Sequence, residues 1–549
     1  MKKIIRTVLV VPALLFAFSA CSDKLDIEQH GVDSKDTFYT TDDNILSAEA
    51  EMFIAFRQSP SNAVAVGLPS AFYGSMDWAW INNKEGASDN AWSGGGGRGE
   101  NIDGDAVSEW SFDSDNPSIR AYYVLLYCIN YRACLILDNV AEGQSTIGDM
   151  VRAEARVIQS FCYFELVTLF GNVPLVDHCL TPDEYKVTNS TPAEIWAFLE
   201  ENLNTAINSG KLPEKSGVND RTQWRVTKQF AQALLGKVYL WQGKNSDAAT
   251  QFDNVINSGK YALFTGLYGD MQHAGNDFNS ENMFEINRIP DASTSQGFQF
   301  KGIYFNLRAD KFSFNGSGTE GSASDYFETS GWGICVPTQQ LYDAFMAEEG
   351  PDGYRFKQTI RSYSDYKKEY GLEMVNGAVA LGDSVWYWKS RYIKSDREGI
   401  TSNRSYQTVY MRYAEVLLLA AEANLAAGNQ SKCDTYYNMI RTRAQLPTRS
   451  GVTLEQIKTE KRLELCGEGV RLQDLRRWGD AEKFLGAKGE KLKNGIPHLE
   501  CNDGVIKVVY ENYYASESSY GYKTGKHEYW PIPAMELLAN PNMNQNPGY

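Results

Sequence analysis

The strongest constraint on the fold is a helical spacing of apolar residues that recurs along the chain. In six segments apolar side chains return every three or four residues, which places them on one face of a helix. These segments are 118–141, 150–170, 227–242, 247–257, 410–427 and 432–444. The second of them stops at Gly171-Asn172-Val173-Pro174, a helix-ending turn followed by a proline. The pattern predicts a mainly α-helical fold.

Two pairs of these segments are joined by short turns that contain glycine, at Gly243 and Gly428. In the first pair, the small residue Gly236 precedes Tyr239, and Ala248 precedes Phe252. This arrangement resembles the packing positions of a tetratricopeptide repeat, in which small residues admit a bulky one from the partner helix. The spacing between pairs is irregular, so we expect the helix pairs to form a scaffold within a larger fold and not a free-standing solenoid.

Two long segments, 75–115 and 266–332, lack a sustained period and are rich in Gly, Asn, Asp, Ser and aromatic residues. Loops of this length in a folded protein usually carry function. Their aromatic content argues against simple disorder. We therefore expect binding residues in these two segments.

The charge balance excludes several classes of function. The 549 residues include 53 Lys and Arg against 69 Asp and Glu, a formal net charge of −16, which disfavours binding to nucleic acid. The sequence contains only five histidines, which disfavours zinc sites and acid–base catalysis by histidine. The phosphate-binding, zinc-protease and serine-hydrolase motifs are missing from the sequence. We expect no cofactor and no metal, with a calcium site that involves Asp103 and Asp105 or Asp113 and Asp115 as the weaker alternative.

The first 20 residues have the features of a signal peptide: basic residues, an apolar stretch over 8–18, and small residues before Cys21. The sequence Phe18-Ser19-Ala20-Cys21 resembles the lipobox of bacterial lipoproteins, which implies that Cys21 carries the lipid. Several acyl chains give a stable membrane anchor. Residues 21–30 would form a lipidated tether, and loss of the signal peptide would change the net charge to −19, because it contains three basic and no acidic residues.

Six further segments occur in an order that spans nearly the whole chain. They are 152–175, 225–243, 331–345, 410–423, 460–479 and 530–549, and they include Gly331-Trp332-Gly333, Asp474-Leu475-Arg476-Arg477-Trp478-Gly479 and Trp530-Pro531-Ile532-Pro533. Together these segments resemble the SusD/RagB family of outer-membrane lipoproteins. Cys466-Gly467 and Gln473 depart from the residues expected at those positions.

The resemblance implies one compact, mainly α-helical domain over 31–549, with an N-terminal half at 31–265 and a C-terminal half at 266–549. About four tetratricopeptide-like helix pairs would form its scaffold, opposite a loop-rich ligand-binding face with minor β structure. It also implies a non-catalytic protein of the outer membrane and cell surface. Such a protein captures oligosaccharides or polysaccharide and passes them to a SusC-like, TonB-dependent transporter.

Sugar binding combines aromatic rings, which stack on pyranose C–H faces, with side chains that hydrogen-bond to hydroxyl groups. The segment 70–105 holds this mixture, and from it we expect Trp78, Trp80, Asn90 and Trp92 to bind ligand. Trp78 and Trp80 alternate, so in extended backbone their rings would point the same way. Asn90 and Trp92 also fall where the family's first ligand loop lies.

The second long loop region supplies Phe300, Tyr304 and Trp332. In the family this half provides the other wall of the binding platform. An equally weighted alternative for Trp332 is structural, because Gly331-Trp332-Gly333 precedes a helix and the ring would fix that corner.

Two rival functions remain open at this point. A peptide ligand, as in the RagB branch of the family, would favour backbone-pairing edges over clustered tryptophans. A lipid-anchored glycoside hydrolase would need two carboxylates about 5–9 Å apart beside the aromatic residues, for which Asp77 and Asp89 are the candidate pair.

The family-like segments also contain eight charged residues on predicted helices or their connections. For these we predict buried or half-buried ion pairs that hold helices together. They are Arg412, Glu415, Glu422, Arg462, Glu464, Arg471, Asp474 and Arg476.

Overall fold

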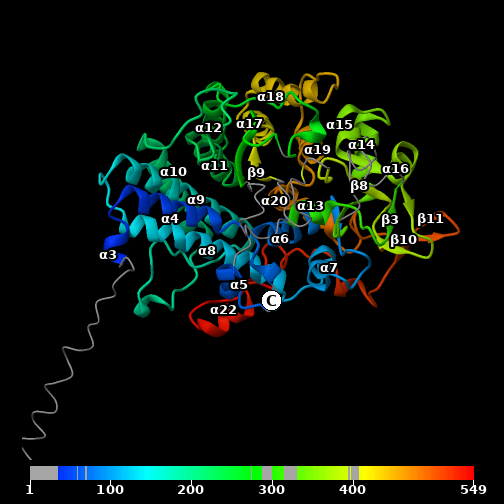
Figure 1. The fold of residues 1–549 in the computed structure, drawn as a ribbon, viewed down its shortest axis with the longest axis horizontal. Coiled ribbons are helices and arrows are strands. Elements are labelled where there is room, and N and C mark those ends of the chain that lie inside the picture. Colours follow the sequence, from blue (N-terminus) through cyan, green and yellow to red (C-terminus); the bar gives the residue numbers. More distant parts are fainter. Residues whose placement is uncertain are drawn as a thin grey trace, which may run out of the picture.

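The computed structural model describes residues 35–57, 60–68, 71–273, 275–286, 300–314, 331–393, 396 and 407–549. The fold is mainly α-helical, with small sheets, of which the one that contains residues 496–511 lies at the right-hand side (Figure 1). Cys21, the predicted lipid site, and the rest of residues 1–34 lie outside the described part. Within that part, no helix combines the length and the apolar character needed to cross a membrane.

The α-helices are α3 (Lys35–Phe38), α4 (Asp42–Ile54), α5 (Pro60–Val66), α6 (Met76–Trp80), α7 (Ile102–Glu109), α8 (Pro117–Asn139), α9 (Thr146–Phe170), α10 (Pro192–Asn208), α11 (Lys228–Trp241), α12 (Asn245–Asn257), α13 (Phe300–Phe305), α14 (Gln339–Glu349), α15 (Tyr354–Thr359), α16 (Tyr363–Tyr370), α17 (Tyr413–Ala426), α18 (Gln430–Arg443), α19 (Leu454–Leu465), α20 (Arg471–Trp478), α21 (Ala481–Leu485) and α22 (Ala534–Ala539). Shorter turns are η1 (Ala71–Gly74), the π-helical η2 (Ile81–Gly86), η3 (Pro182–Glu184), η4 (Tyr268–Asp270) and η7 (Glu517–Ser519).

The strands are β1 (Ala91–Ser93), β2 (Asn282–Ile286), β3 (Phe312–Ser313), β4 (Cys335–Pro337), β5 (Ile360–Ser362), β6 (Glu373–Met374), β7 (Val379–Leu381), β8 (Val385–Tyr387), β9 (Thr408–Arg412), β10 (Ile496–Asn502) and β11 (Val505–Glu511). Among the described residues they form one three-stranded antiparallel sheet, β11-β10-β7, and the antiparallel pairs β1-β4, β2-β9, β3-β6 and β5-β8.

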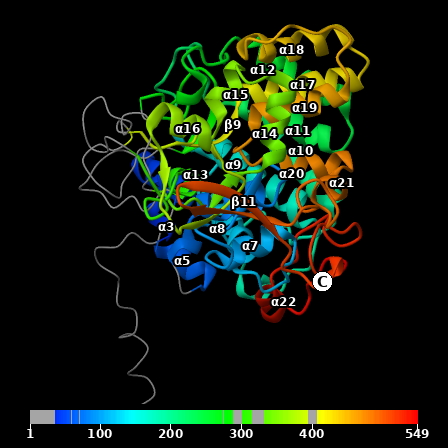
Figure 2. The same ribbon diagram turned by 90° about the vertical axis from the view of Figure 1, so that its right-hand side faces the viewer.

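The six helices predicted from apolar spacing are all present. They pack as the pairs α8–α9, α11–α12 and α17–α18, with α10 between α9 and α11 (Figures 1 and 2). A Cβ atom at Gly236 would lie 2.5 Å from Phe252 Cε1, so the small residue admits the ring of the partner helix as predicted. Helix α17 begins at Tyr413, later than predicted, because 408–412 form strand β9 against β2.

Segments far apart in the sequence are tied together by strand pairing and by hydrogen bonds from the C-terminal segment. Strand β1 pairs with β4, so Trp92 lies opposite Val336. Near the C-terminus, Asn540 Nδ2 donates to Val187 O at 2.6 Å and Asn546 Nδ2 to Phe170 O at 2.7 Å. In both ribbon views α22 therefore lies beneath α8, away from α18 (Figures 1 and 2).

Seven of the eight predicted structural charges form ion pairs in the interior. Arg412 contacts Glu281, Glu464 and Glu468, while Arg462 and Arg471 both hold Asp89. The remaining pairs join Glu415 to Lys237, Glu422 to Arg477 and Asp474 to Lys461. The prediction is wrong for Arg476, whose guanidinium has no hydrogen-bond partner among the described residues and lies 4.6 Å from the Trp530 ring centroid.

Candidate aromatic binding site

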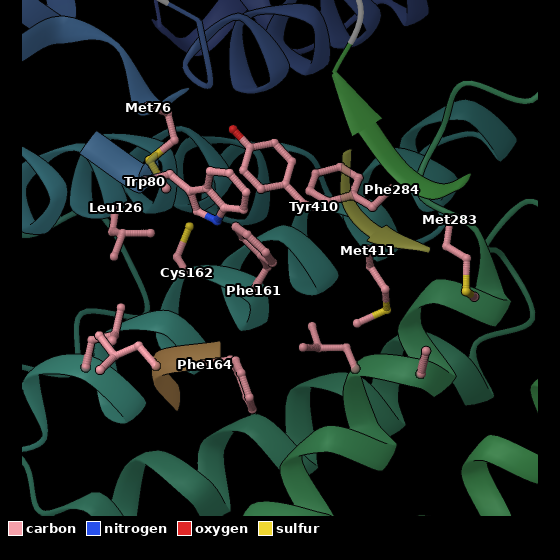
Figure 3. Packing of buried hydrophobic residues seen from close by; sticks show 14 of the residues in the cluster. Met76, Trp80, Leu126, Phe161, Cys162, Phe164, Met283, Phe284, Tyr410 and Met411 are labelled. Atoms are coloured by element: carbon pink, nitrogen blue, oxygen red, sulfur yellow. The ribbon is translucent and has the colours of Figure 1, made fainter. Parts of the chain in front are cut away.

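The segment 75–115, expected to be a ligand loop, instead forms part of the core. It contains α6, η2, β1 and α7, and nearly all its residues from Met76 to Ser93 are buried. Trp78 and Trp80 lie on helix α6 and not in extended backbone, so the expectation that they point the same way is wrong. Trp80 packs with Met76, Phe161 and Tyr410 in the core (Figure 3).

The two tryptophans of α6 pack against residues that the sequence did not indicate. The Trp80 ring centroid is 6.2 Å from that of Tyr410, and a Cβ atom at Gly469 would lie 2.5 Å from Trp80 Cζ2. Trp78 makes an edge contact with Tyr73 at 4.5 Å between centroids. Both side chains are buried, so neither offers a ring face to a ligand in this structure.

Asn90 and Trp92 are also fixed in the interior. Trp92 Nε1 donates to Asp383 Oδ2 at 2.7 Å, and Arg462 Nε donates to Asn90 Oδ1 at 2.9 Å. The Asn90 carbonyl accepts from Thr338 N at 3.0 Å. These contacts hold strand β1 against β4 and α19, so the structure assigns both residues a packing role in place of the expected surface position.

Phe300, Tyr304 and Trp332 do come together, and Phe72 of η1 joins them. Phe72 is 5.4 Å from Phe300 and 5.6 Å from Trp332 between ring centroids, and Tyr304 is 6.0 Å from Trp332. We call these four residues the aromatic cluster. Phe300 and Tyr304 are its buried members, whereas Phe72 is 42% exposed and Trp332 is half-buried. The surface of the cluster is thus made by Phe72 and Trp332.

The position of Trp332 is set by its backbone. Trp332 N donates to Ile303 O at 2.7 Å, and Gly333 N donates to Asn306 O at 2.9 Å, which ties the corner to α13. Gly331 approaches Asn306 so closely that a Cβ atom would lie 2.2 Å from its carbonyl oxygen. The corner is therefore rigid, and the ring still reaches the surface. Both readings of Trp332 that the sequence allowed are compatible with this geometry.

Charged side chains border the aromatic cluster. Arg308 Nη1 approaches the Trp332 carbonyl at 3.4 Å and pairs with Glu100, while Arg308 Nε donates to Asp310 Oδ1 at 2.8 Å. Glu100 and Asp310 are about half exposed. A partly exposed ring beside carboxylates and a guanidinium can stack on a sugar ring and hydrogen-bond to its hydroxyl groups. Sequence reasoning missed Phe72, Glu100 and Arg308, because only the fold brings them beside Trp332.

The structure argues against Asp89 as an acid catalyst. Arg471 Nε lies 2.8 Å from Asp89 Oδ1 and Arg462 Nη2 2.9 Å from Asp89 Oδ2, all inside the protein. Burial alone would raise the pKa of Asp89, but the two guanidinium groups outweigh it and hold the pKa at about 2. A carboxyl in this state is ionised at neutral pH and cannot donate a proton. Asp77 is also buried.

No group of three or more His, Cys, Asp or Glu side chains in the described ranges is arranged to hold a metal ion. Eight cysteines, Cys128, Cys134, Cys162, Cys179, Cys335, Cys433, Cys466 and Cys501, are free thiols in the structure.

Comparison with known proteins matches the chain over most of its length. Residues 304–549 match the model of the SusD family, and residues 90–240 match a family described as "Starch-binding associating with outer membrane". SusD-like protein P2 of Formosa agariphila is 25% identical over 473 residues, covering 81% of this chain and 83% of that protein. A SusD-like protein of Bacteroides ovatus is 22% identical and covers 98% and 97%.

Solved structures show the same fold. A laminarin-binding SusD-like protein superposes with a TM-score of 0.71 at 24% identity, covering 92% of this chain and 99% of that one. Surface glycan-binding protein A from Bacteroides thetaiotaomicron, in complex with laminarihexaose, also gives a TM-score of 0.71, at 20% identity with the same coverage.

Proposed function

The chain belongs to the SusD family, and from that membership we propose that it is a non-catalytic, lipid-anchored glycan-binding protein of the outer membrane surface. Its work would be to capture oligosaccharides or polysaccharide and deliver them to a SusC-like, TonB-dependent transporter. Cys21 would carry the anchor. The fold-related proteins named for laminarin and laminarihexaose support a glycan as the ligand.

The observation that carries this proposal is the aromatic cluster. Of its surface residues, Trp332 lies on a rigid corner and Phe72 packs against it from η1, so little conformational entropy is lost when a sugar ring stacks on them. Arg308 and Glu100 supply charged hydrogen-bonding groups at the edge. We propose Trp332 as the principal stacking residue, with Phe72 beside it. Phe300 supports both rings from below, and Tyr304 supports that of Trp332.

Replacing Trp332 with alanine is expected to weaken strongly the retardation of the protein in native gels that contain the bound polysaccharide. The reason is loss of the stacking surface. The measurement is affinity electrophoresis of the chain from Ser22 onward against starch, laminarin, fructan, hemicellulose, pectin, mucin glycans and a peptide mixture. Phe72→Ala, at a 42% exposed position, tests the same surface with less risk to folding.

The matched control is Trp224→Ala, because Trp224 is 48% exposed and belongs to neither the aromatic cluster nor its charged border. This variant is expected to migrate as wild type. Retardation as strong as that of wild type in both Trp332→Ala and Phe72→Ala would contradict the aromatic cluster as the principal glycan site. Binding confined to the peptide mixture would favour the peptide rival, and turnover of any sugar would contradict the non-catalytic assignment.

A further inference from the structure

A groove of about 1020 Å³ lies between α8, the loop 171–191 and α22. In Figure 1 these elements border the lower part of the molecule. The groove shares no lining residue with the aromatic cluster. Its size is that of a pocket for a small ligand.

One wall is a stripe of tyrosines on α8. Tyr123, Tyr127 and Tyr131 are spaced four residues apart, so they lie along one face of the helix. Tyr131 is 54% exposed, and its ring is open at the rim. Tyr127 Oη donates to Pro174 O at 2.7 Å, which fixes its ring against the opposite wall.

The opposite wall is the loop 171–191, which carries Tyr185 at 62% exposure. Asparagine side chains hold its backbone in place: Asn130 Nδ2 donates to Val176 O at 2.8 Å, Asn540 Nδ2 to Val187 O at 2.6 Å and Asn542 Nδ2 to Lys186 O at 2.7 Å. The groove is thus preorganised, and binding need not order its walls.

The charges along the groove nearly balance. Arg132 and His178 are the basic groups, and Glu536 of α22 is the acidic one. Such a balance offers no field that would select a polyanion or a polycation. The exposed rings of Tyr131 and Tyr185 offer flat apolar surfaces beside these few polar groups, a combination suited to a ligand with C–H faces and hydroxyl groups.

We propose that this tyrosine groove is a second carbohydrate site, which takes pyranose rings of a neutral oligosaccharide. The inference rests on the proposed function of the chain as a glycan-binding protein. Two sites on one anchored molecule would hold a long polysaccharide by avidity, since the second contact is made at high effective concentration.

The contacts of the groove favour a glycan over a peptide or an acyl chain. An extended peptide needs carbonyl partners for its N–H groups, and the wall carbonyls of Pro174, Val176, Lys186 and Val187 already accept hydrogen bonds from side chains. An acyl chain would shield the charged groups of Arg132 and Glu536 from water, which is unfavourable.

The double variant Tyr131→Ala/Tyr185→Ala tests the proposal. Both side chains are more than half exposed, so the fold should survive, as a thermal melt will check. Binding of neutral hexasaccharides from α- and β-glucan, xylan and fructan is measured by calorimetry. Amide hydrogen exchange of residues 123–135 and 174–187 is followed with each sugar and with a peptide mixture. It is measured in wild type, in this double variant, in Trp332→Ala and in the control Trp224→Ala.

We expect one of these sugars to slow amide exchange in both segments in wild type, in Trp332→Ala and in Trp224→Ala. The double variant should lose this protection, and its groove should bind the sugar at least tenfold more weakly. Sugar binding with no protection of either segment would overturn the second site and leave the proposed function standing. Protection by a peptide mixture in place of sugars would overturn the ligand class. Absence of binding by any sugar would overturn the proposed function and the groove proposal with it.

Discussion

Replacement of Arg412 by methionine is expected to lower the free energy of unfolding by about 3–5 kcal/mol, because it leaves buried carboxylates without their shared cation. Arg412 Nη1 lies 2.6 Å from both Glu281 Oε1 and Glu464 Oε1, and its Nε lies 2.7 Å from Glu468 Oε2. All four side chains are buried, so water cannot replace the lost contacts.

The network joins strand β9 to the end of α19 and to the segment before β2. Its loss should therefore lower the stability of the whole fold and not only of one element. Denaturation in guanidinium chloride, followed by circular dichroism, measures the change. The control is Lys357→Ala, which removes an exposed pair with Asp352 at 2.7 Å and should leave the midpoint nearly unchanged. A midpoint for Arg412→Met as close to wild type as that of Lys357→Ala would show that the network does not stabilise the fold.

Acid is expected to destabilise the protein steeply between about pH 4.5 and pH 2. Burial would raise the pKa of Glu464 and Glu468, but Arg443, Arg412 and Arg355 around the first, and Arg412 and Lys389 around the second, hold both pKa values at about 2. Asp89 behaves in the same way beside Arg462 and Arg471. In the unfolded chain these carboxyls titrate near pH 4.

The folded state therefore binds fewer protons than the unfolded state in this window, and stability falls as the pH falls. The contribution of these carboxylates is present above about pH 4.5 and lost as the pH approaches 2. Each pKa unit corresponds to about 1.4 kcal/mol, so three such groups together contribute several kcal/mol. Asp105 acts in the opposite sense, because burial raises its pKa to about 7 and its contribution is lost as the pH rises towards neutrality.

Thermal melts at pH 7, 5, 4, 3 and 2 measure this dependence. The melting temperature should drop most between pH 4 and pH 2, and the drop should shrink in Arg412→Met, where Glu464 and Glu468 have lost a common partner. A melting temperature that stays level from pH 5 to pH 2.5 would contradict the ionised state assigned to these carboxylates.

The helical scaffold could be predicted from the sequence because its signal is local. Apolar spacing within a single helix identified α8, α9, α11, α12, α17 and α18, and the Gly236–Phe252 contact follows from residues on adjacent helices. The ion pairs were predictable in kind, since charged residues on otherwise apolar helices need partners. Their partners were not predicted, because Glu281 and Lys237 lie far from Arg412 and Glu415 in the sequence.

The candidate site was predicted only in part, because burial depends on contacts between distant segments. Trp80 and Trp92 resemble ligand residues in a Gly- and Asn-rich segment. In the structure Trp80 packs against Tyr410 and Trp92 donates to Asp383, each about 300 residues away, and both rings are buried. Trp332 was correctly placed beside Phe300 and Tyr304. No single segment of the sequence indicated the tyrosine groove, because α8, the loop 171–191 and α22 each supply one wall.

Calorimetric titration of the chain from Ser22 onward with an oligosaccharide of the retarded polysaccharide tests the central claim most directly. The account predicts saturable binding of intact sugar, with no turnover, that is weakened at least tenfold in Trp332→Ala and unchanged in Trp224→Ala. Heat from the peptide mixture alone, or release of shorter sugars during the titration, would contradict it.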